Sequence, residues 1–151
     1  MNYYNEIKEQ LINNEVYKKV KDYSKNRNEL ETYYNVGKLI IEAQGGETRA
    51  KYGNGLIKEW SNELTNLYGK GYDLSNLKRM RQLYLTFQKG GTVCHQLSWS
   101  HYRYILPINN ENKRNYYINL CIKQILSVRE LKEKIKKKLI NNFLNIIINF
   151  F

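Results

Sequence analysis

The sequence is poor in residues that mark several common classes of protein. It has two cysteines, Cys94 and Cys121, and a single proline in 151 residues. Two isolated cysteines do not make the disulfide framework of a small secreted domain. The chain also shows no secretory leader and no apolar run near the ~20 residues that a membrane helix needs. We therefore expect a cytoplasmic protein that does not bind a membrane.

Metal chemistry lacks the residues that it requires. A metal-dependent nuclease needs paired carboxylates and a nearby lysine, but aspartate occurs only at Asp22 and Asp73. Glu130-Leu131-Lys132 fits an E-x-K pattern, yet it has no acidic partner on a preceding strand and its surroundings read as helix. The zinc-type ligands have no C-x-x-C or H-x-x-x-H spacing; they are Cys94, His95, His101 and Cys121. We predict no catalytic residue, metal or cofactor.

Acidic charge is missing mainly from the second part of the chain. The formal net charge is +11, although residues 1–69 balance ten basic side chains with ten acidic ones. Residues 70–103 hold six basic side chains and one acidic side chain, and residues 113–138 hold nine basic side chains and two acidic ones. A segregated excess of this kind attracts polyanions such as nucleic acid. The alternative is a solvated surface produced by an AT-rich genome, but such drift does not explain the neutral first part.

Helical spacing of apolar residues runs through most of the chain and indicates an all-α fold. We expect a compact multi-helix domain of about seven helices over residues 1–140. In the first helix Ile7, Leu11 and Ile12 should face inward. Asp73 and Ser98 are expected N-caps, and Ser127 with Glu130 forms a capping box. The expected helices cover residues 3–20, 28–43, 55–68, 73–88, 98–106, 111–124 and 128–139.

Residues 141–151 differ from the rest because they carry no charge and many large apolar groups. Three interpretations compete. The first is a truncated or frame-shifted end where another domain once followed, the second is a surface that packs into a dimer or partner, and the third is a membrane contact beside the basic run at 132–138. We rank them in that order.

The helices expected at 55–68 and 73–88 flank a glycine turn at 69–71, as in a helix-turn-helix DNA reader. The second of these helices should bury Leu77, Met80, Tyr84 and Phe87. Its opposite face carries side chains of the kind that bond phosphates and base edges. They are Ser75, Lys78, Arg79, Gln82, Thr86 and Lys89, with Arg81 on the flank. The stretch 92–95 is expected to extend briefly, like a wing.

Several spaced motifs carry a family resemblance: YGNGLI at 52–57, GKGY at 69–72, NLKRMRQLY at 76–84 and QLSWSHYR at 96–103. Together they resemble the N-terminal domain of YhcG-type PD-(D/E)XK nucleases, over roughly residues 5–139. The resemblance implies a helical, helix-turn-helix-like DNA-binding domain that precedes a separate nuclease domain. This chain ends before such a domain could begin, so the resemblance implies the binding half without the cutting half.

We therefore predict a non-catalytic domain that binds double-stranded DNA, with Lys78, Arg79 and Gln82 facing the groove. The expected partners also include a nuclease domain or subunit and further copies of the chain. One alternative is a protein-interaction or dimerisation domain that docks an acidic partner, such as a separately encoded nuclease or restriction subunit. Another is an RNA binder. The remaining candidate contacts, mostly to phosphates, are Ser75, Arg81, Lys89, Arg103, Arg129, Lys132 and Lys136.

Overall fold

The computed structural model describes residues 2–46, 54–89 and 91–150, with the side chains of 14–22 and 54 left out. Every regular element in these ranges is helical, which confirms the all-α prediction. The chain forms two compact units, Met1–Gln96 and Leu97–Phe151. The helices are α1 (Tyr3–Ala43), α3 (Asn54–Tyr68), the 3-10 helix η1 (Lys70–Tyr72), α4 (Leu74–Phe87), α5 (Trp99–Ile105), α6 (Glu111–Gln124) and α7 (Val128–Phe150).

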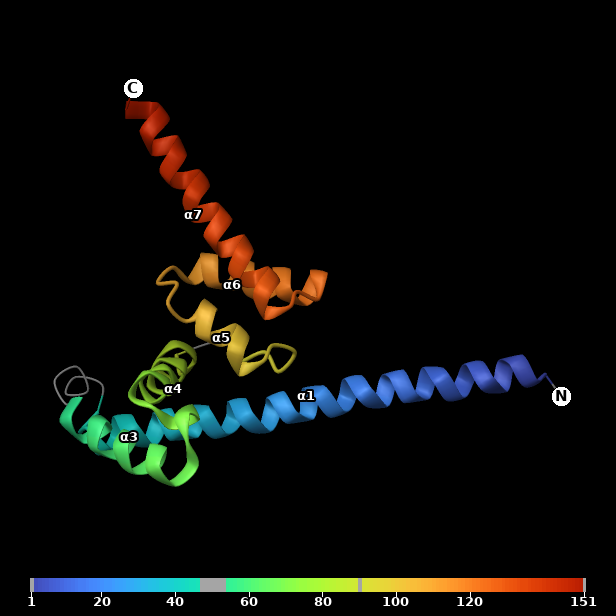
Figure 1. The fold of residues 1–151 in the computed structure, drawn as a ribbon, viewed down its shortest axis with the longest axis horizontal. Helices are drawn as coiled ribbons and strands as arrows, with labels where there is room; N and C mark the ends of the chain where they lie inside the picture. Colours follow the sequence, from blue (N-terminus) through green and yellow to red (C-terminus); the bar gives the residue numbers. More distant parts are fainter. Residues whose placement is uncertain (1, 47–53, 90, 151) are drawn as a thin grey trace. The chain divides into compact units, whose positions relative to one another are not determined.

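In the first unit α4 packs against the C-terminal half of α1, and α3 packs against α4 and η1 (Figure 1). The C-terminal half of α1 carries an apolar face on which Leu30, Ile40 and Ile41 are buried. Gly37 lies on the same face, where the backbone of α4 passes close by at Met80. The core of the unit therefore forms where α1 and α4 cross, and it is completed by Ile57, Leu77, Met80 and Leu83.

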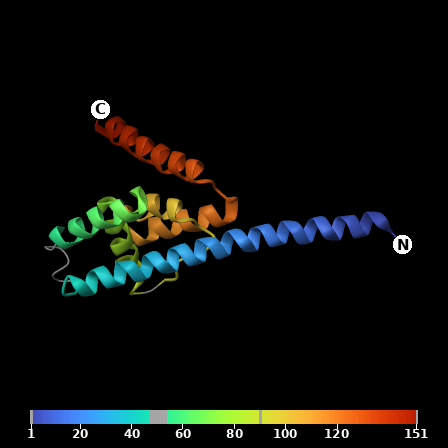
Figure 2. The ribbon, with the colours of Figure 1, turned by 60° about the horizontal axis from the view of Figure 1, so that its bottom comes forward.

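The prediction of two helices in residues 3–43 is wrong, because α1 is a single helix of 41 residues. The segment between the two expected helices contains neither glycine nor proline, the residues that most strongly interrupt a helix. The inward placement of Ile7, Leu11 and Ile12 is also wrong: they are 59%, 61% and 49% exposed. This half of α1 extends beyond α3 and α4 (Figure 1 and Figure 2), so neither helix covers it.

The second unit packs α5 against α6 and α7. Tyr102 and Leu131 are fully buried within it. His101 ties α5 to the turn between α6 and α7, since its Nε2 lies 2.8 Å from the Leu126 carbonyl oxygen. A carbonyl only accepts, so Nε2 donates, and the neutral ring's Nδ1 then accepts from the Ser98 backbone N–H at 3.2 Å. These two contacts orient the turn at Leu126 relative to the start of α5.

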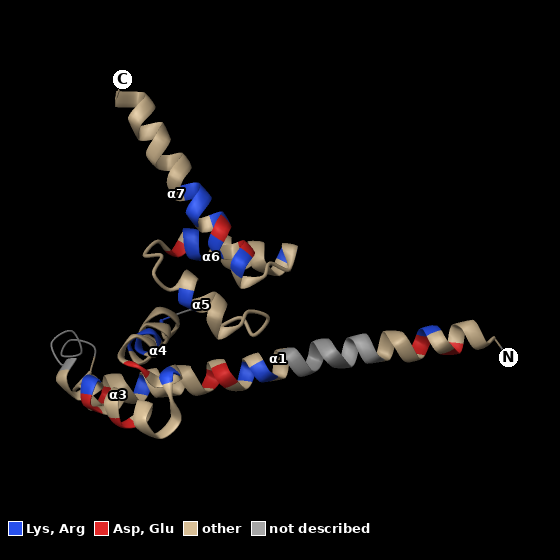
Figure 3. Cartoon of the chain, in the orientation of Figure 1, with Lys and Arg blue, Asp and Glu red and all other residues tan. Residues whose placement is uncertain are grey.

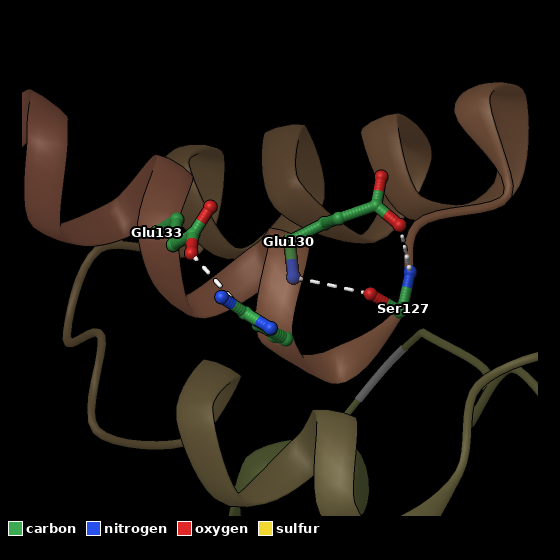
Figure 4. A network of polar contacts seen from close by, with 4 residues as sticks. Ser127, Glu130 and Glu133 are labelled. Atoms are coloured by element: carbon green, nitrogen blue, oxygen red, sulfur yellow. Dashed lines mark hydrogen bonds and ion pairs between the residues drawn. The ribbon is translucent and has the colours of Figure 1, made fainter.

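The helix α7 begins with the expected capping box and then continues to Phe150 without a break. The Glu130 N–H donates to Ser127 Oγ at 3.2 Å, and the Ser127 N–H donates to Glu130 Oε1 at 3.4 Å (Figure 4). Leu131 is buried, whereas Leu139, two turns further along the helix, is 65% exposed. The uncharged residues after 140 are thus helical and exposed.

Candidate nucleic-acid interface

The turn between α3 and α4 is built from local signals in the sequence. Gly69 ends α3 with φ 97°, a left-handed conformation that suits glycine. After the 3-10 turn, Asp73 caps α4, and its Oδ1 accepts the Asn76 N–H at 2.8 Å. The helix-turn-helix-like pair is therefore present, and the expected role of Asp73 is confirmed.

The inner face of α4 holds the helix against the first unit. Leu77 and Met80 are buried as predicted, and Leu83 is buried as well, although the sequence argument did not name it. Tyr84 and Phe87 are only half-buried, which corrects their expected place in the core. Tyr84 instead packs edge-on against Tyr34 of α1, with ring centroids 5.1 Å apart. These contacts fix which side of α4 faces outward.

The outer face of α4 forms a shallow hollow of about 400 Å³ without a carboxylate in its lining. Five predicted contact residues come together in it, so the sequence placed them correctly on one face. Lys89 lies beyond the end of α4 and is exposed, and Thr86 is half-buried. The lining is Ser75, Lys78, Arg79, Arg81, Gln82 and Leu85.

Hydrogen bonds order the planar groups around this hollow. Arg79 donates to Gln82 Oε1 at 2.6 Å along the helix. Arg81 donates to Gln44 Oε1 at 3.1 Å, which links α4 to the C-cap of α1. Burial lowers the pKa of Arg81, but an arginine keeps its charge at neutral pH. Two guanidinium groups held in fixed directions can bind phosphate or the edge of guanine with paired hydrogen bonds.

The expected wing at 92–95 is not a strand, because the described residues there are irregular or turn. Thr92, Val93 and His95 line another hollow of about 400 Å³ together with side chains of α1 and Phe87. This part of the chain covers α1 rather than extending from the outer face of α4. The wing interpretation is therefore wrong.

The remaining predicted contacts belong to the second unit. Arg103 is exposed on α5. Arg129, Lys132 and Lys136 are exposed and spaced by three and four residues, which puts them on one face of α7. Figure 3 shows basic residues concentrated in the first half of this helix. The Arg129–Glu133 pair, 3.4 Å apart, is exposed on both sides and adds little stability.

Two lysines of the second unit lie over tyrosine rings. Lys132 Nζ lies 5.7 Å from the centre of the Tyr104 ring, and Lys138 Nζ lies 4.8 Å from that of Tyr116. Each pair brings a residue of α7 onto a ring of α5 or α6. The partners are more than 20 residues apart in sequence, so no local pattern signals them.

The described residues include no cluster of three or more histidine, cysteine or acidic side chains that could hold a metal ion. Glu130 occupies a helical position and completes the capping box with Ser127 (Figure 4), so its E-x-K pattern has a structural explanation. Cys94 and Cys121 lie in different units. Within the described ranges, none of the helices is sufficiently long and apolar to cross a bilayer.

Comparison with known proteins agrees with the motifs. The sequence profile of the DUF1016 N-terminal domain family matches residues 6–142. The "Putative nuclease YhcG" of Escherichia coli (strain K12) is 48% identical over 58 residues, which are 38% of this chain and 16% of that protein. No solved structure matches the chain significantly. Because the alignment covers so little of YhcG, it establishes relationship to a nuclease-associated domain and not an activity.

Proposed function

The chain belongs to the DUF1016 N-terminal domain family, and we propose that it binds double-stranded DNA through the outer face of α4. The observation that carries this proposal is the hollow lined by Ser75, Lys78, Arg79, Arg81 and Gln82 without a carboxylate. A solvated helix surface usually mixes acidic and basic residues, since pairs four apart stabilise it. An arrangement of cations and amide groups alone suits a polyanion with hydrogen-bonding edges.

Each group in the hollow has a role in this proposal. Arg79 and Gln82, already joined at 2.6 Å, present donors and an acceptor to base edges in the major groove. Lys78 and Ser75 contact the phosphate backbone. Arg81 is the positioning residue, because its bond to Gln44 holds the outer face in a fixed orientation relative to α1. The second unit adds phosphate contacts from Arg103 and the basic face of α7.

We further propose that the residues of this chain do not cut DNA themselves. Two observations support this: Glu130 is engaged in a helix cap, and the described residues offer no acidic metal cluster. A plasmid incubated with the protein and magnesium or manganese should remain uncut. Metal-dependent cleavage that survives Glu130→Ala would reveal a different site, whereas cleavage lost in that variant would restore the E-x-K interpretation.

Fluorescence anisotropy with labelled duplexes tests the binding proposal. Affinity should fall steeply with salt, because the slope of log K against log salt is about 0.9 per phosphate contact. Replacing Arg79 or Gln82 by Ala should cost about 1–3 kcal/mol on the preferred sequence, whereas Lys78→Ala should weaken all sequences and reduce the slope by about one. Lys58→Ala, an exposed lysine of α3 outside the hollow, is the matched control for loss of charge.

Three results would contradict the proposal. If Lys78→Ala, Arg79→Ala and Gln82→Ala melt and bind like the parent, α4 is not the reader and the basic face of α7 takes its place. If the parent binds neither duplex DNA nor RNA at low salt, the alternative of docking an acidic protein partner is favoured. Tighter binding to RNA than to DNA would identify an RNA binder.

A further inference from the structure

The last three turns of α7 expose a broad apolar surface. Residues 139–150 contain no charged side chain, and eight of their large apolar side chains are exposed. Monomeric proteins seldom leave a contiguous apolar patch of this kind in water. The eight are Leu139, Ile140, Phe143, Leu144, Ile146, Ile147, Ile148 and Phe150.

The asparagines in this segment give the helix two distinct sides. At 100° per residue, Asn141, Asn142, Asn145 and Asn149 fall within an arc of about 100°. On the other side, Ile140, Leu144 and Ile147 follow one another at steps of four and three residues, and they are 49%, 49% and 37% exposed. Steps of three and four place apolar residues along the seam where two helices pair. We call these three residues the α7 seam.

We propose that two copies of this protein pair through the α7 seam, with the two helices antiparallel. The pairing buries uncharged apolar side chains of both copies, so no charge has to be removed from water. It leaves the asparagine side in contact with solvent. The proposal concerns association of the chain with itself and does not depend on nucleic-acid binding.

Charge selects the antiparallel direction. Lys132, Lys134 and Lys136–Lys138 precede the seam on the same helix. Parallel helices would place the two basic runs side by side, where like charges repel each other. Antiparallel helices place them at opposite ends. We place Leu144 opposite the partner's Ile147, a register in which the basic runs of the two copies lie beyond the seam contact.

The basic run also argues for a second copy over a lipid surface as the occupant. A helix that lies on a bilayer keeps its lysines on the polar side. Here Lys132 and Lys136 continue the line of Ile140 and the rest of the seam at steps of four residues. Burying the seam in lipid would therefore draw those two lysines toward the acyl chains. In an antiparallel pair they lie beyond the contact and stay in water.

Sedimentation equilibrium of the full chain without DNA tests the pairing. We expect a species of twice the 18.1 kDa chain mass that dissociates on dilution. Leu144→Glu puts a carboxylate into the seam of each copy and should weaken the dimer at least about tenfold. Asn145→Glu is the matched control, since it adds the same charge one residue away on the asparagine side and should leave the dimer intact. Circular dichroism verifies that both variants remain helical.

Crosslinking with a short bismaleimide tests the direction, with the native cysteines retained and the parent as blank. In the antiparallel register the thiols introduced by Leu144→Cys lie close together near the twofold axis. Those introduced by Glu133→Cys lie about 25 residues of helix apart, or roughly 37 Å. We therefore expect a crosslinked dimer for Leu144→Cys and none above the blank for Glu133→Cys.

Four results would overturn the proposal. A parent chain that stays monomeric at about 100 µM, or a dimer that Leu144→Glu leaves unchanged, excludes pairing through the seam. Efficient crosslinking of Glu133→Cys excludes the antiparallel direction. Leu144-dependent sedimentation with phosphatidylserine vesicles by a chain that is monomeric in solution would assign the seam to lipid instead.

Discussion

Gly37 is the position where a single methyl group should do most damage to the first unit. A Cβ added there would lie 2.7 Å from the Met80 carbonyl carbon and 3.0 Å from Tyr84 Cβ, and closer still to the Met80 carbonyl oxygen. Two of these atoms belong to the backbone of α4, so no rotamer change relieves the clash. The Gly37→Ala variant must therefore move α1 and α4 apart at their crossing.

The magnitude follows from two opposing effects. Overpacking a well-packed core costs about 1–3 kcal/mol, and a clash with backbone atoms belongs at the upper end of that range. Alanine in a helix interior is in turn favoured over glycine by about 1 kcal/mol. We expect Gly37→Ala to destabilise the protein by about 2 kcal/mol. Gly55→Ala is the matched control, because its Cβ would meet nothing within 4 Å, and it should be neutral or stabilising.

Thermal unfolding followed by circular dichroism at 222 nm measures both variants. A loss of about 2 kcal/mol should lower Tm by roughly 4–8 °C for a chain of this size. Titration with urea checks that the two variants have the same m-value as the parent. A Gly37→Ala protein that melts with or above the parent, while Gly55→Ala behaves as expected, would refute the close approach of α1 and α4.

Two further predictions concern single residues. Ile125 ends α6 with φ 50°, an unfavourable conformation for a β-branched residue. Urea titration of Ile125→Gly should therefore show a free energy of unfolding about 1–2 kcal/mol higher than that of the parent. A lower value would show that the exposed side chain packs elsewhere. Burial, and then the hydrogen bond to Glu29, raises the pKa of Tyr33 to about 12, above about 10 in an unfolded chain. The contribution of Tyr33 to stability is therefore present below pH 10 and lost as pH rises toward 12. In the Tyr33→Phe variant, Tm should fall less steeply over that pH range, and the absorbance titration at 295 nm should lose one late ionisation. Unchanged curves would contradict this.

Local signals were read correctly from the sequence because their chemistry lies within a few residues. Asp73, Ser98 and Ser127 each cap a helix through an oxygen that accepts an N–H three residues ahead. The same holds for the outer face of α4, where helical geometry alone gathers the polar residues. Periodicity states which side chains share a face, and that was enough to place Lys78 and Gln82 in the same hollow.

Periodicity does not state what covers a face. Ile7 and Leu11 have the spacing of a buried helix, yet no part of α3 or α4 reaches them (Figure 1). The contact between Arg81 and Gln44 spans 37 residues, and the approach of Met80 to Gly37 spans more. Such pairs depend on how two helices cross, which a single sequence does not specify. The error at residues 3–43 had a different origin, because the segment between the two expected helices contains neither glycine nor proline to end a helix.

The inner and outer sides of α4 make different contacts. Substitutions on the outer side can therefore test the proposed interface separately from the packing of the helix. Gly37 and the buried Met80 determine how closely α4 sits on α1. On the outer side, Arg79 donates a hydrogen bond to Gln82 of the same helix. Both residues are half-buried and neither belongs to the apolar core, so truncating the outer pair should cost far less stability than truncating Met80. A loss of DNA affinity without a loss of stability is then attributable to the interface itself.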